Sequence, residues 1–351
     1  MIFNVNWLGD VLFSAATIRN IRRNFPESFI ACIIPSRCYP VLKGNPYLDE
    51  IIIFDEEDRH KGIREKLKFA QLLKHKRFDV VFLLHRSFSR ALISRLAGIP
   101  ERIGYHTRKR AFLLTKKISP PAKDTLHRID YYLNIIEKAG LKVEDRYTEF
   151  FIGDEDINFV DTFLSKQNIG KVVLLRQGFE GLSPEALAKG DDFLVAINPG
   201  GNWLPKRWPK EYWARLSDRL INEFGARVII TGSASDLPEA AEIQHLMVGK
   251  AILTCGVFNL KQLAALCKKL NLFITADTGP LHIANAVGTK RIIALFGPTS
   301  PKITGPYPDK NVIILSKDLG CKIPCYVVDC KDNRCMKAIT VDDVIKQITI
   351  K

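Results

Sequence analysis

The stretch Thr275-Ala276-Asp277-Thr278-Gly279-Pro280-Leu281-His282-Ile283-Ala284-Asn285-Ala286 reads as a buried strand that breaks into a polar turn and then opens a helix. Residues 270–274 form a short apolar run before it, Thr278 is a suitable N-cap, and Pro280 suits the first helical position. Free N–H groups at such a helix start bind anions, because the helix dipole adds partial positive charge there. His282 projects from the same turn, so this turn is a candidate diphosphate site, with an ordinary strand-to-helix turn as the alternative.

Length and composition indicate a soluble globular protein. The chain has 351 residues, enough for two domains, and 46% of them are hydrophobic. No run approaches the ~18 apolar residues that span a bilayer, and the first residues do not resemble a signal peptide. We therefore expect a cytoplasmic protein. Four cysteines lie in or beside apolar segments, as in a reducing compartment: Cys32, Cys38, Cys255 and Cys267.

The positive charge is concentrated in one region. Of the net charge of +14, residues 59–117 supply all, with 17 Lys or Arg against three Asp or Glu, while the remaining 35 basic and 35 acidic residues balance. This localisation favours an anionic surface or substrate, although a solvated helix face is the alternative. The sequence contains no zinc finger, RNP-type aromatic motif or helix-turn-helix pattern. We therefore expect no nucleic-acid partner.

Short apolar strands alternate with helical patterns, which predicts an α/β protein with parallel sheets covered on both faces. The first predicted strands are residues 2–5, 29–34, 51–54 and 79–84. After an ambiguous stretch at 170–192, a second series comprises residues 193–198, 227–231, 272–275 and 291–296. The sequence thus predicts two Rossmann-like domains with a cleft between them, where ligands bind beyond the carboxyl ends of the strands.

Polar loops follow several of these strands: Asn6-Trp7-Leu8-Gly9-Asp10, Pro199-Gly200-Gly201-Asn202-Trp203, Gly232-Ser233-Ala234-Ser235-Asp236 and Gly297-Pro298-Thr299-Ser300-Pro301. No GxGxxG motif opens the first strand-to-helix turn. A nicotinamide-dependent dehydrogenase is therefore disfavoured.

An ordered set of motifs resembles glycosyltransferase family 9, the ADP-heptose:lipopolysaccharide heptosyltransferases. The set is Gly9-Asp10-Val11-Leu12, Pro199-Gly200 with Lys206-Arg207-Trp208-Pro209, and Asp277-Thr278-Gly279-Pro280-Leu281-His282 with Gly297-Pro298-Thr299. The loops at 6–10 and 232–236 are more similar to the heptosyltransferase II branch. Each motif is weak alone, but together they run in the expected order from residue 2 to about 315.

The resemblance implies a GT-B fold, ADP-L-glycero-D-manno-heptose as donor, an inner-core lipopolysaccharide acceptor, and inversion at the sugar without a metal cofactor. We expect an acceptor-binding domain at residues 1–180 and a nucleotide-sugar-binding domain at 181–335. We expect the last helix, within 336–351, to pack back onto the N-terminal domain, with Thr340 and Asp343 as its capping box. An acceptor built on anionic lipid A implies a peripheral position at the inner face of the inner membrane.

An inverting transfer needs a base that takes the acceptor proton on the face opposite the leaving ADP. Asp10 is our candidate, because an aspartate in a loop just before a helix start stays charged, and a plain N-cap role is the alternative. The departing ADP develops negative charge, which Lys206 on its glycine-rich loop would offset. Arg207 fits a scaffold or surface role.

On the donor side, the resemblance implies that Asp277 accepts hydrogen bonds from sugar hydroxyls. Asp236 suits a ribose hydroxyl, with Glu239 or Glu242 as alternatives. The residues expected to hold the donor are Gly200, Lys206, Asp236, Asp277, Thr278, Gly279 and His282.

The acceptor residues are predicted from charge and position. Arg86 follows a predicted strand and is a reasonable phosphate or carboxylate contact, and Arg110 belongs to the basic run Arg108-Lys109-Arg110. Simple solvation of these side chains is the alternative.

Near the C-terminus, Cys321, Cys325, Cys330 and Cys335 form a C-x3-C-x4-C-x4-C cluster. Four thiolates at this spacing could hold a structural zinc ion, stay as free thiols or form disulfides.

Two other functions stay open within the α/β class. One is a family 9 transferase with a different sugar donor or acceptor. The other is a non-catalytic protein that binds a nucleotide sugar, and the joint presence of Asp10, Lys206, Asp277 and His282 argues against it.

Overall fold

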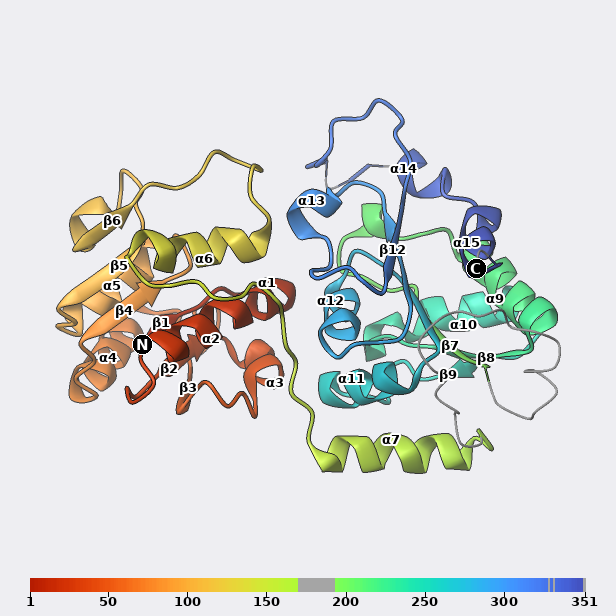
Figure 1. Cartoon of the computed structure of the whole chain (residues 1–351), viewed down its shortest axis with the longest axis horizontal. Helices are drawn as coiled ribbons and strands as arrows, with labels where there is room; N and C mark the ends of the chain where they lie inside the picture. The colour runs from red at the N-terminus through yellow and green to blue at the C-terminus, as the bar shows by residue number, and fades with distance from the viewer. Residues whose placement is uncertain (170–192, 328, 331, 350–351) are drawn as a thin grey trace. The chain divides into compact units, whose positions relative to one another are not determined.

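The computed structural model describes residues 1–169, 193–327, 329–330 and 332–349. The chain forms two compact units, Met1–Phe151 and Ile152–Lys351, each with its own sheet (Figure 1). Among the described residues, no helix combines the length and apolar character needed to cross a bilayer.

The first unit contains a six-stranded parallel sheet with the strand order β3-β2-β1-β4-β5-β6. This is the order of a doubly wound Rossmann sheet. Its strands are β1 (Ile2–Phe3), β2 (Ala31–Ile34), β3 (Glu50–Ile53), β4 (Val80–Leu83), β5 (Glu101–Tyr105) and β6 (Lys116–Ile118). Its α-helices are α1 (Leu8–Phe13), α2 (Ala15–Asn24), α3 (Tyr39–Leu42), α4 (Ile63–His75), α5 (Phe88–Leu96) and α6 (Arg128–Lys138), with short 3-10 turns η1 (Ser36–Cys38) and η2 (Ala111–Leu113).

The second unit repeats this topology in the order β12-β11-β10-β7-β8-β9, again with all strands parallel. The strands are β7 (Phe193–Asn198), β8 (Ala226–Ile230), β9 (Ile252–Leu253), β10 (Leu272–Ala276), β11 (Ile292–Phe296) and β12 (Val312–Ser316). The helices are α7 (Asp154–Lys166), α9 (Lys210–Phe224), α10 (Leu237–Leu246), α11 (Leu260–Lys269), α12 (Gly279–Ala286), α13 (Pro301–Thr304), α14 (Arg334–Lys337) and α15 (Val341–Thr349), with 3-10 turns η3 (Leu204–Lys206) and η4 (Ala234–Asp236). The predicted pair of Rossmann-like parallel sheets is confirmed.

The central strands are apolar because both faces of each sheet are covered. Every residue of β7, β10 and β11 is buried. Along β7, Val195 and Ile197 join one core cluster, while Leu194 and Ala196 join the cluster on the opposite face. This alternation follows from the two-residue period of a strand, and it explains why these segments read as continuous hydrophobic runs.

The C-terminal helix differs from our expectation for residues 336–351. Val344, Ile345 and Ile348 of α15 are buried in the core of the second unit, in the cluster that contains Trp208. The Trp208 indole N–H donates to the Ile339 carbonyl at 2.8 Å and fixes the segment before the helix. Its capping box forms as predicted, since Asp343 accepts from the Thr340 N–H at 2.8 Å.

The division between the units also differs from the expected one. Val160 and Leu164 of α7 are buried with Leu266 of α11, so α7 belongs to the second unit although it precedes residue 180. The expected boundary itself, between residues 180 and 181, lies outside the described residues.

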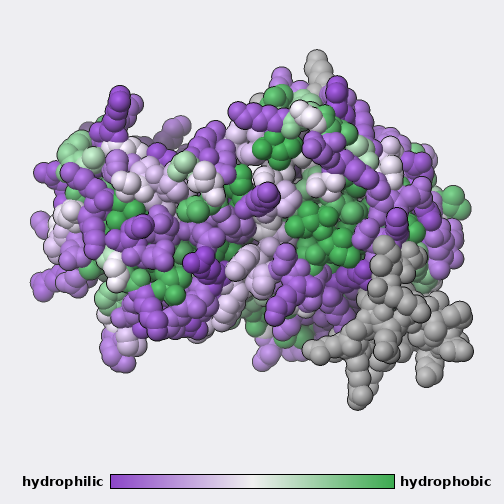
Figure 2. Space-filling view, turned by 45° about the horizontal axis from the view of Figure 1, so that its top comes forward, coloured by the Kyte–Doolittle hydropathy of each residue, from purple (hydrophilic) through white to green (hydrophobic). Residues whose placement is uncertain are grey.

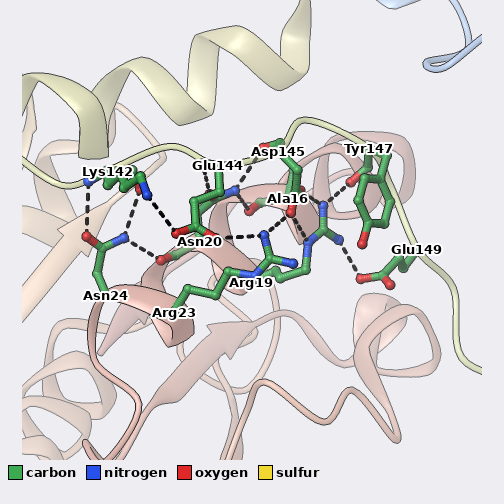
Figure 3. A network of polar contacts seen from close by, with 10 residues as sticks. All are labelled: Ala16, Arg19, Asn20, Arg23, Asn24, Lys142, Glu144, Asp145, Tyr147 and Glu149. Carbon is green, nitrogen blue, oxygen red and sulfur yellow. Dashed lines mark hydrogen bonds and ion pairs between the residues drawn. The ribbon is translucent and has the colours of Figure 1, made fainter.

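A polar network holds the end of the first unit against α2 (Figure 3). The fully buried guanidinium of Arg19 forms ion pairs with Asp145 and Glu149 and donates to the Tyr147 carbonyl at 2.7 Å. Asn20 donates to the Asp145 carbonyl at 2.9 Å. Burial alone lowers the pKa of Arg19, but the two carboxylates outweigh it and raise the pKa above its ordinary value. The extended segment after α6 is therefore tied to α2 by charge and hydrogen bonds.

We predict that Asp145→Asn destabilises the protein more than Glu144→Gln. The first change removes the negative charge that faces the buried Arg19 guanidinium. Hydrogen bonds to charged groups contribute about 1.5 to 3 kcal/mol. The Glu144 carboxylate contacts two exposed cations, Arg23 at 3.3 Å and Lys142 at 3.4 Å. Exposed pairs contribute about 0 to 1 kcal/mol. Urea unfolding of both variants measures the difference, and equal losses would show that burial of Arg19 carries no special cost.

Candidate functional site

In the second unit, the loops that leave the carboxyl ends of β7, β8 and β10 meet closely. A Cβ atom on Gly200 would lie 2.5 Å from the Asp236 carboxyl carbon, and one on Gly201 would lie 3.1 Å from a Thr278 methyl carbon. Only glycine permits the first of these approaches. The structure therefore brings Gly200, Asp236 and Thr278 to one edge of the sheet, as the sequence predicts for a ligand site.

A buried ion pair lies at the centre of this edge. Lys206 Nζ donates to Asp277 Oδ2 at 2.8 Å and to the Asp277 carbonyl at 2.9 Å. Thr304 Oγ1 donates to the same Oδ2 at 3.2 Å, and His282 Nε2 lies 3.5 Å from Oδ1. Asp277 is only 3% exposed. The carboxylate predicted to meet sugar hydroxyls is thus mainly occupied in fixing Lys206.

The Asp277 carboxylate is strongly held in its charged form. Burial by itself raises the pKa of Asp277, but the hydrogen bond from His282 and the charge of Lys206 outweigh it, and the pKa falls well below its usual range. A carboxyl whose folded pKa is lowered stabilises the fold above its unfolded pKa of about 3.9, and that contribution is lost as pH falls below it. At neutral pH the Asp277 carboxylate is therefore charged.

The turn after β10 has the predicted N-cap, but Pro280 is the second helical residue and not the first. Thr278 occupies the N-cap position of α12, with extended backbone, and Gly279 is the first helical residue. Within the described part of the chain, the Thr278 side chain makes no capping hydrogen bond, and its Oγ1 instead lies 3.3 Å from Thr275 Oγ1. The N–H groups of the first turn are therefore not capped by this side chain, and His282 lies one turn further along the same helix.

Asp236 has a structural contact that the sequence did not suggest. Its Oδ2 accepts from the Ser233 N–H at 2.8 Å and from the Ser233 hydroxyl at 2.6 Å, which closes the turn after β8. Arg207 donates to the Gly201 carbonyl at 2.9 Å and to Glu239 at 2.7 Å, and its Nη2 lies 3.7 Å from Asp236 Oδ1. Arg207 therefore joins the β7 and β8 loops, as its expected scaffold role requires. Glu242 pairs instead with Lys210 on the exposed surface.

In the first unit, Asp10 lies within the first turn of α1, because that helix begins at Leu8. Our prediction placed it just before the helix, and the N-cap residue is Trp7. The Tyr132 hydroxyl donates to Asp10 Oδ1 at 2.8 Å. Burial, followed by the charge of Asp10, raises the pKa of Tyr132 well above its ordinary value. The tyrosine is therefore a permanent hydrogen-bond donor to this carboxylate.

Sequence reasoning missed both groups that hold the loop around Asp10. Tyr132 lies in the apolar face of α6 and is 3% exposed. Arg90, on α5, is 2% exposed and donates to the Asn4 carbonyl and to the Asn6 side chain. Neither residue belongs to a motif. The sequence marked them only as polar side chains at positions of α5 and α6 that would otherwise be apolar.

The two predicted acceptor residues have different surroundings. Arg86 is exposed. Arg110 is fully buried and donates to the Tyr105 carbonyl at 2.8 Å and to the His85 carbonyl at 2.6 Å. Burial, and secondly the charge of Arg86, lowers the pKa of Arg110 to about 10. The Arg110 N–H groups therefore donate to backbone carbonyls in the loop after β4 and at the end of β5, whereas Arg86 faces solvent.

The four C-terminal cysteines are free thiols, with Cys321 exposed and the others half-buried. In the ranges that the structure describes, no three His, Cys, Asp or Glu side chains are grouped so that they could hold a metal ion. Residues 328 and 331, within the cluster, lie outside those ranges. The segment covers the loop after β11, since the Cys325 N–H donates to the Pro298 carbonyl at 2.7 Å.

Solved structures share this architecture across the whole chain. A glycosyl transferase family 9 structure from Veillonella parvula has a TM-score of 0.84, with 26% identity over 98% of this chain and 94% of that one. The Escherichia coli ADP-heptose lps heptosyltransferase II has a TM-score of 0.77, with 23% identity over 99% of this chain and 96% of that one. The predicted GT-B fold is therefore confirmed.

Curated sequences agree. Lipopolysaccharide heptosyltransferase 2 of Escherichia coli is 27% identical over 322 residues, 90% of this chain and 87% of that protein. Lipooligosaccharide heptosyltransferase 2 of Campylobacter jejuni is 29% identical over 355 residues, 97% of this chain and 95% of that protein. Residues 66–334 match the family described as Glycosyltransferase family 9 (heptosyltransferase). Because this match covers more than half of the sequence, the chain belongs to glycosyltransferase family 9 and is a glycosyltransferase.

Proposed function

We propose that this enzyme transfers heptose from ADP-L-glycero-D-manno-heptose to the inner core of lipopolysaccharide, with inversion at the sugar. The observation that carries the proposal is the Lys206–Asp277 pair beside the start of α12, which sets a cation and helix N–H groups at one sheet edge. Such an arrangement suits a diphosphate leaving group. The relatives named heptosyltransferase 2, which align with about nine-tenths of this chain or more, support the choice of sugar and acceptor.

In this proposal the second unit binds the donor. The diphosphate lies against the first turn of α12, near Thr278, Gly279 and His282. The absence of a side chain at Gly200 lets the loop after β7 lie directly against Asp236. Lys206 offsets the negative charge that develops on ADP as the glycosidic bond breaks. Asp277 positions Lys206 and accepts from a sugar hydroxyl through Oδ1. We retain Asp236 for a ribose hydroxyl.

The first unit binds the acceptor and carries the base. An acceptor hydroxyl attacks the anomeric carbon on the face opposite ADP, and its proton passes to Asp10 as the bond to ADP breaks. Tyr132 holds Asp10 Oδ1, which leaves Oδ2 to receive the proton. We assign no metal ion to this step, because Lys206 and the α12 N–H groups supply the positive charge. Exposed Arg86 meets an anionic group of the acceptor.

We place the enzyme at the cytoplasmic side of the inner membrane as a peripheral protein, because an acceptor on lipid A stays in that surface. The basic region at residues 59–117 is suited to such an anionic surface.

The direct test is incubation of the purified enzyme with ADP-heptose and a set of truncated lipopolysaccharide acceptors, followed by mass analysis. We expect one heptose to be added to an inner-core acceptor. Transfer from another nucleotide sugar, with none from ADP-heptose, would overturn the assigned donor while leaving the family unchanged.

We predict that Asp10→Asn lowers turnover by ~10² to 10⁴, because the amide cannot take a proton and loss of general-base catalysis has costs of this size. The affinity for ADP-heptose should barely change, since the proposed donor residues lie elsewhere. Tyr132→Phe should cause a smaller fall in turnover, because Asp10 keeps its charge but loses its fixed orientation. Near-wild-type turnover in Asp10→Asn, at saturating donor and acceptor, would remove this residue from the mechanism.

A second prediction concerns the buried ion pair. Lys206→Gln should lower turnover by ~10² to 10³, as for other groups that stabilise a developing anion. Asp277→Asn should weaken donor binding as well, because Lys206 then loses the carboxylate that fixes it. Lys210→Gln is a matched control, since its pair with Glu242 is exposed and lies in the same unit. Steady-state kinetics of the three variants give the comparison, and a Lys206→Gln enzyme as active as the control would contradict the role of the pair.

A further inference from the structure

Three large apolar side chains on α5 and η2 of the first unit are exposed to solvent. Phe88 begins α5 and is 43% exposed, Leu96 ends the same helix and is 48% exposed, and Phe112 in η2 is 62% exposed. The Phe88 and Phe112 ring centroids are 6.3 Å apart. Arg95 donates to the Phe112 carbonyl at 3.3 Å, which places the end of α5 beside η2. The Phe88 and Phe112 rings are therefore neighbours, and Leu96 lies at the other end of the same helix, next in sequence to Arg95.

Cations surround these side chains. Residues 86–117 contain nine Arg or Lys and a single acidic residue, Glu101. Arg90 and Arg110 are buried, but four cations nearby in sequence are exposed: Arg86, Arg95, Arg108 and Lys109. Within the described ranges, none of these four takes part in an ion pair with a carboxylate. We call Phe88, Leu96 and Phe112 with these four cations the aromatic–cationic patch.

Exposure of aromatic rings does not by itself define a docking surface, as the second unit shows. Phe159 on α7 is also 43% exposed, and its ring lies 6.2 Å from that of Phe258. Its helix, however, carries Asp154, Glu155, Asp156 and Asp161, with Lys166 as its basic residue. The feature that distinguishes the aromatic–cationic patch is therefore the combination of exposed rings with unpaired positive charge. On the face that Figure 2 shows, hydrophilic side chains predominate, and hydrophobic residues appear as separate areas between them.

This combination fits one kind of partner. The interface of a bilayer accepts aromatic rings at the boundary of headgroups and acyl chains, while Arg and Lys stay at the level of anionic headgroups. An acidic protein would satisfy the cations but would leave the rings without an apolar environment unless it also offered one. An uncharged apolar surface would bury the cations without offering them anionic partners.

We propose that the aromatic–cationic patch docks this enzyme on an anionic phospholipid bilayer, with the Phe88 and Phe112 rings entering the interface. The inference deepens the proposed function and rests on it in one respect, namely that the acceptor is carried by a membrane lipid. It makes no use of Asp10 or of the donor residues, and the variants below leave Arg86, the proposed acceptor contact, unchanged, so docking and transfer can be tested separately.

The test is sedimentation of the enzyme with vesicles of equal parts phosphatidylglycerol and phosphatidylethanolamine, or of phosphatidylcholine alone. We expect binding to the anionic vesicles that weakens as salt rises, because charge attraction is screened over about 10 Å at 0.1 M. The double variant Phe88→Ser/Phe112→Ser should lose about tenfold in binding at every salt concentration, as expected for removal of partly inserted rings. Arg108→Gln/Lys109→Gln should instead flatten the salt dependence.

Phe159→Ser is the matched control and should bind as the wild type does. The conservative variant Phe88→Leu/Phe112→Leu should retain most of the binding, which separates lost apolar contact from a damaged fold. Equal binding of the Phe88→Ser/Phe112→Ser variant and the wild type would overturn the proposal, as would equal binding of the wild type to the anionic and the phosphatidylcholine vesicles. The Phe88→Ser/Phe112→Ser variant should keep wild-type turnover on a delipidated acceptor. If neither the wild type nor any variant transfers heptose while vesicle binding still depends on the two rings, the proposed function is wrong and the docking surface stands.

Discussion

The partly buried ion pair between Lys206 and Asp277 is the constraint on which the loops at the carboxyl edge of the second sheet depend. It joins two loops that leave adjacent parallel strands, β7 and β10, although the residues are 71 positions apart in sequence. Burying two charges is costly unless both are paired and hydrogen-bonded. Here the carboxylate also accepts from Thr304, and His282 lies beside it. Lys206 is consequently held in one place, which a flexible ammonium on the surface would not be.

Much of the fold could be predicted from sequence because parallel strands buried on both faces leave an unmistakable pattern. The runs that became β7, β10 and β11 are wholly buried. The destination of the amphipathic helices could not be predicted in this way. The apolar stripe of α15 shows that one face is covered, but not which unit covers it, and the structure places that stripe against the second core. The same reasoning applies to α7, whose buried residues Val160 and Leu164 meet α11.

The site residues were predictable where a loop motif marked a sheet edge, and not where a helix supplied the contact. Lys206, Asp277 and Thr278 lie at one sheet edge, where their loop motifs placed them, although the Lys206–Asp277 ion pair was not predicted. Tyr132 was invisible, because a tyrosine on the apolar face of a helix resembles any core aromatic until its hydroxyl is seen at 2.8 Å from Asp10. Asp236 shows the opposite difficulty, since a carboxylate in a ligand loop can be used by the loop itself, as its bonds to Ser233 show.

Charge counting had a related limit in the first unit. The basic excess at residues 59–117 includes Arg90 and Arg110, but both are buried, and burial lowers the pKa of each to about 10. Their donors hold the carbonyl groups of Asn4, Tyr105 and His85, so they shape loops at the edge of the sheet and do not contribute to the surface. The positive charge that reaches the surface of this region is therefore carried by its exposed side chains, Arg86 among them. The arginines that cluster in sequence thus divide into two groups: buried ones that hold the loops after β1, β4 and β5, and exposed ones that are free to attract an anion.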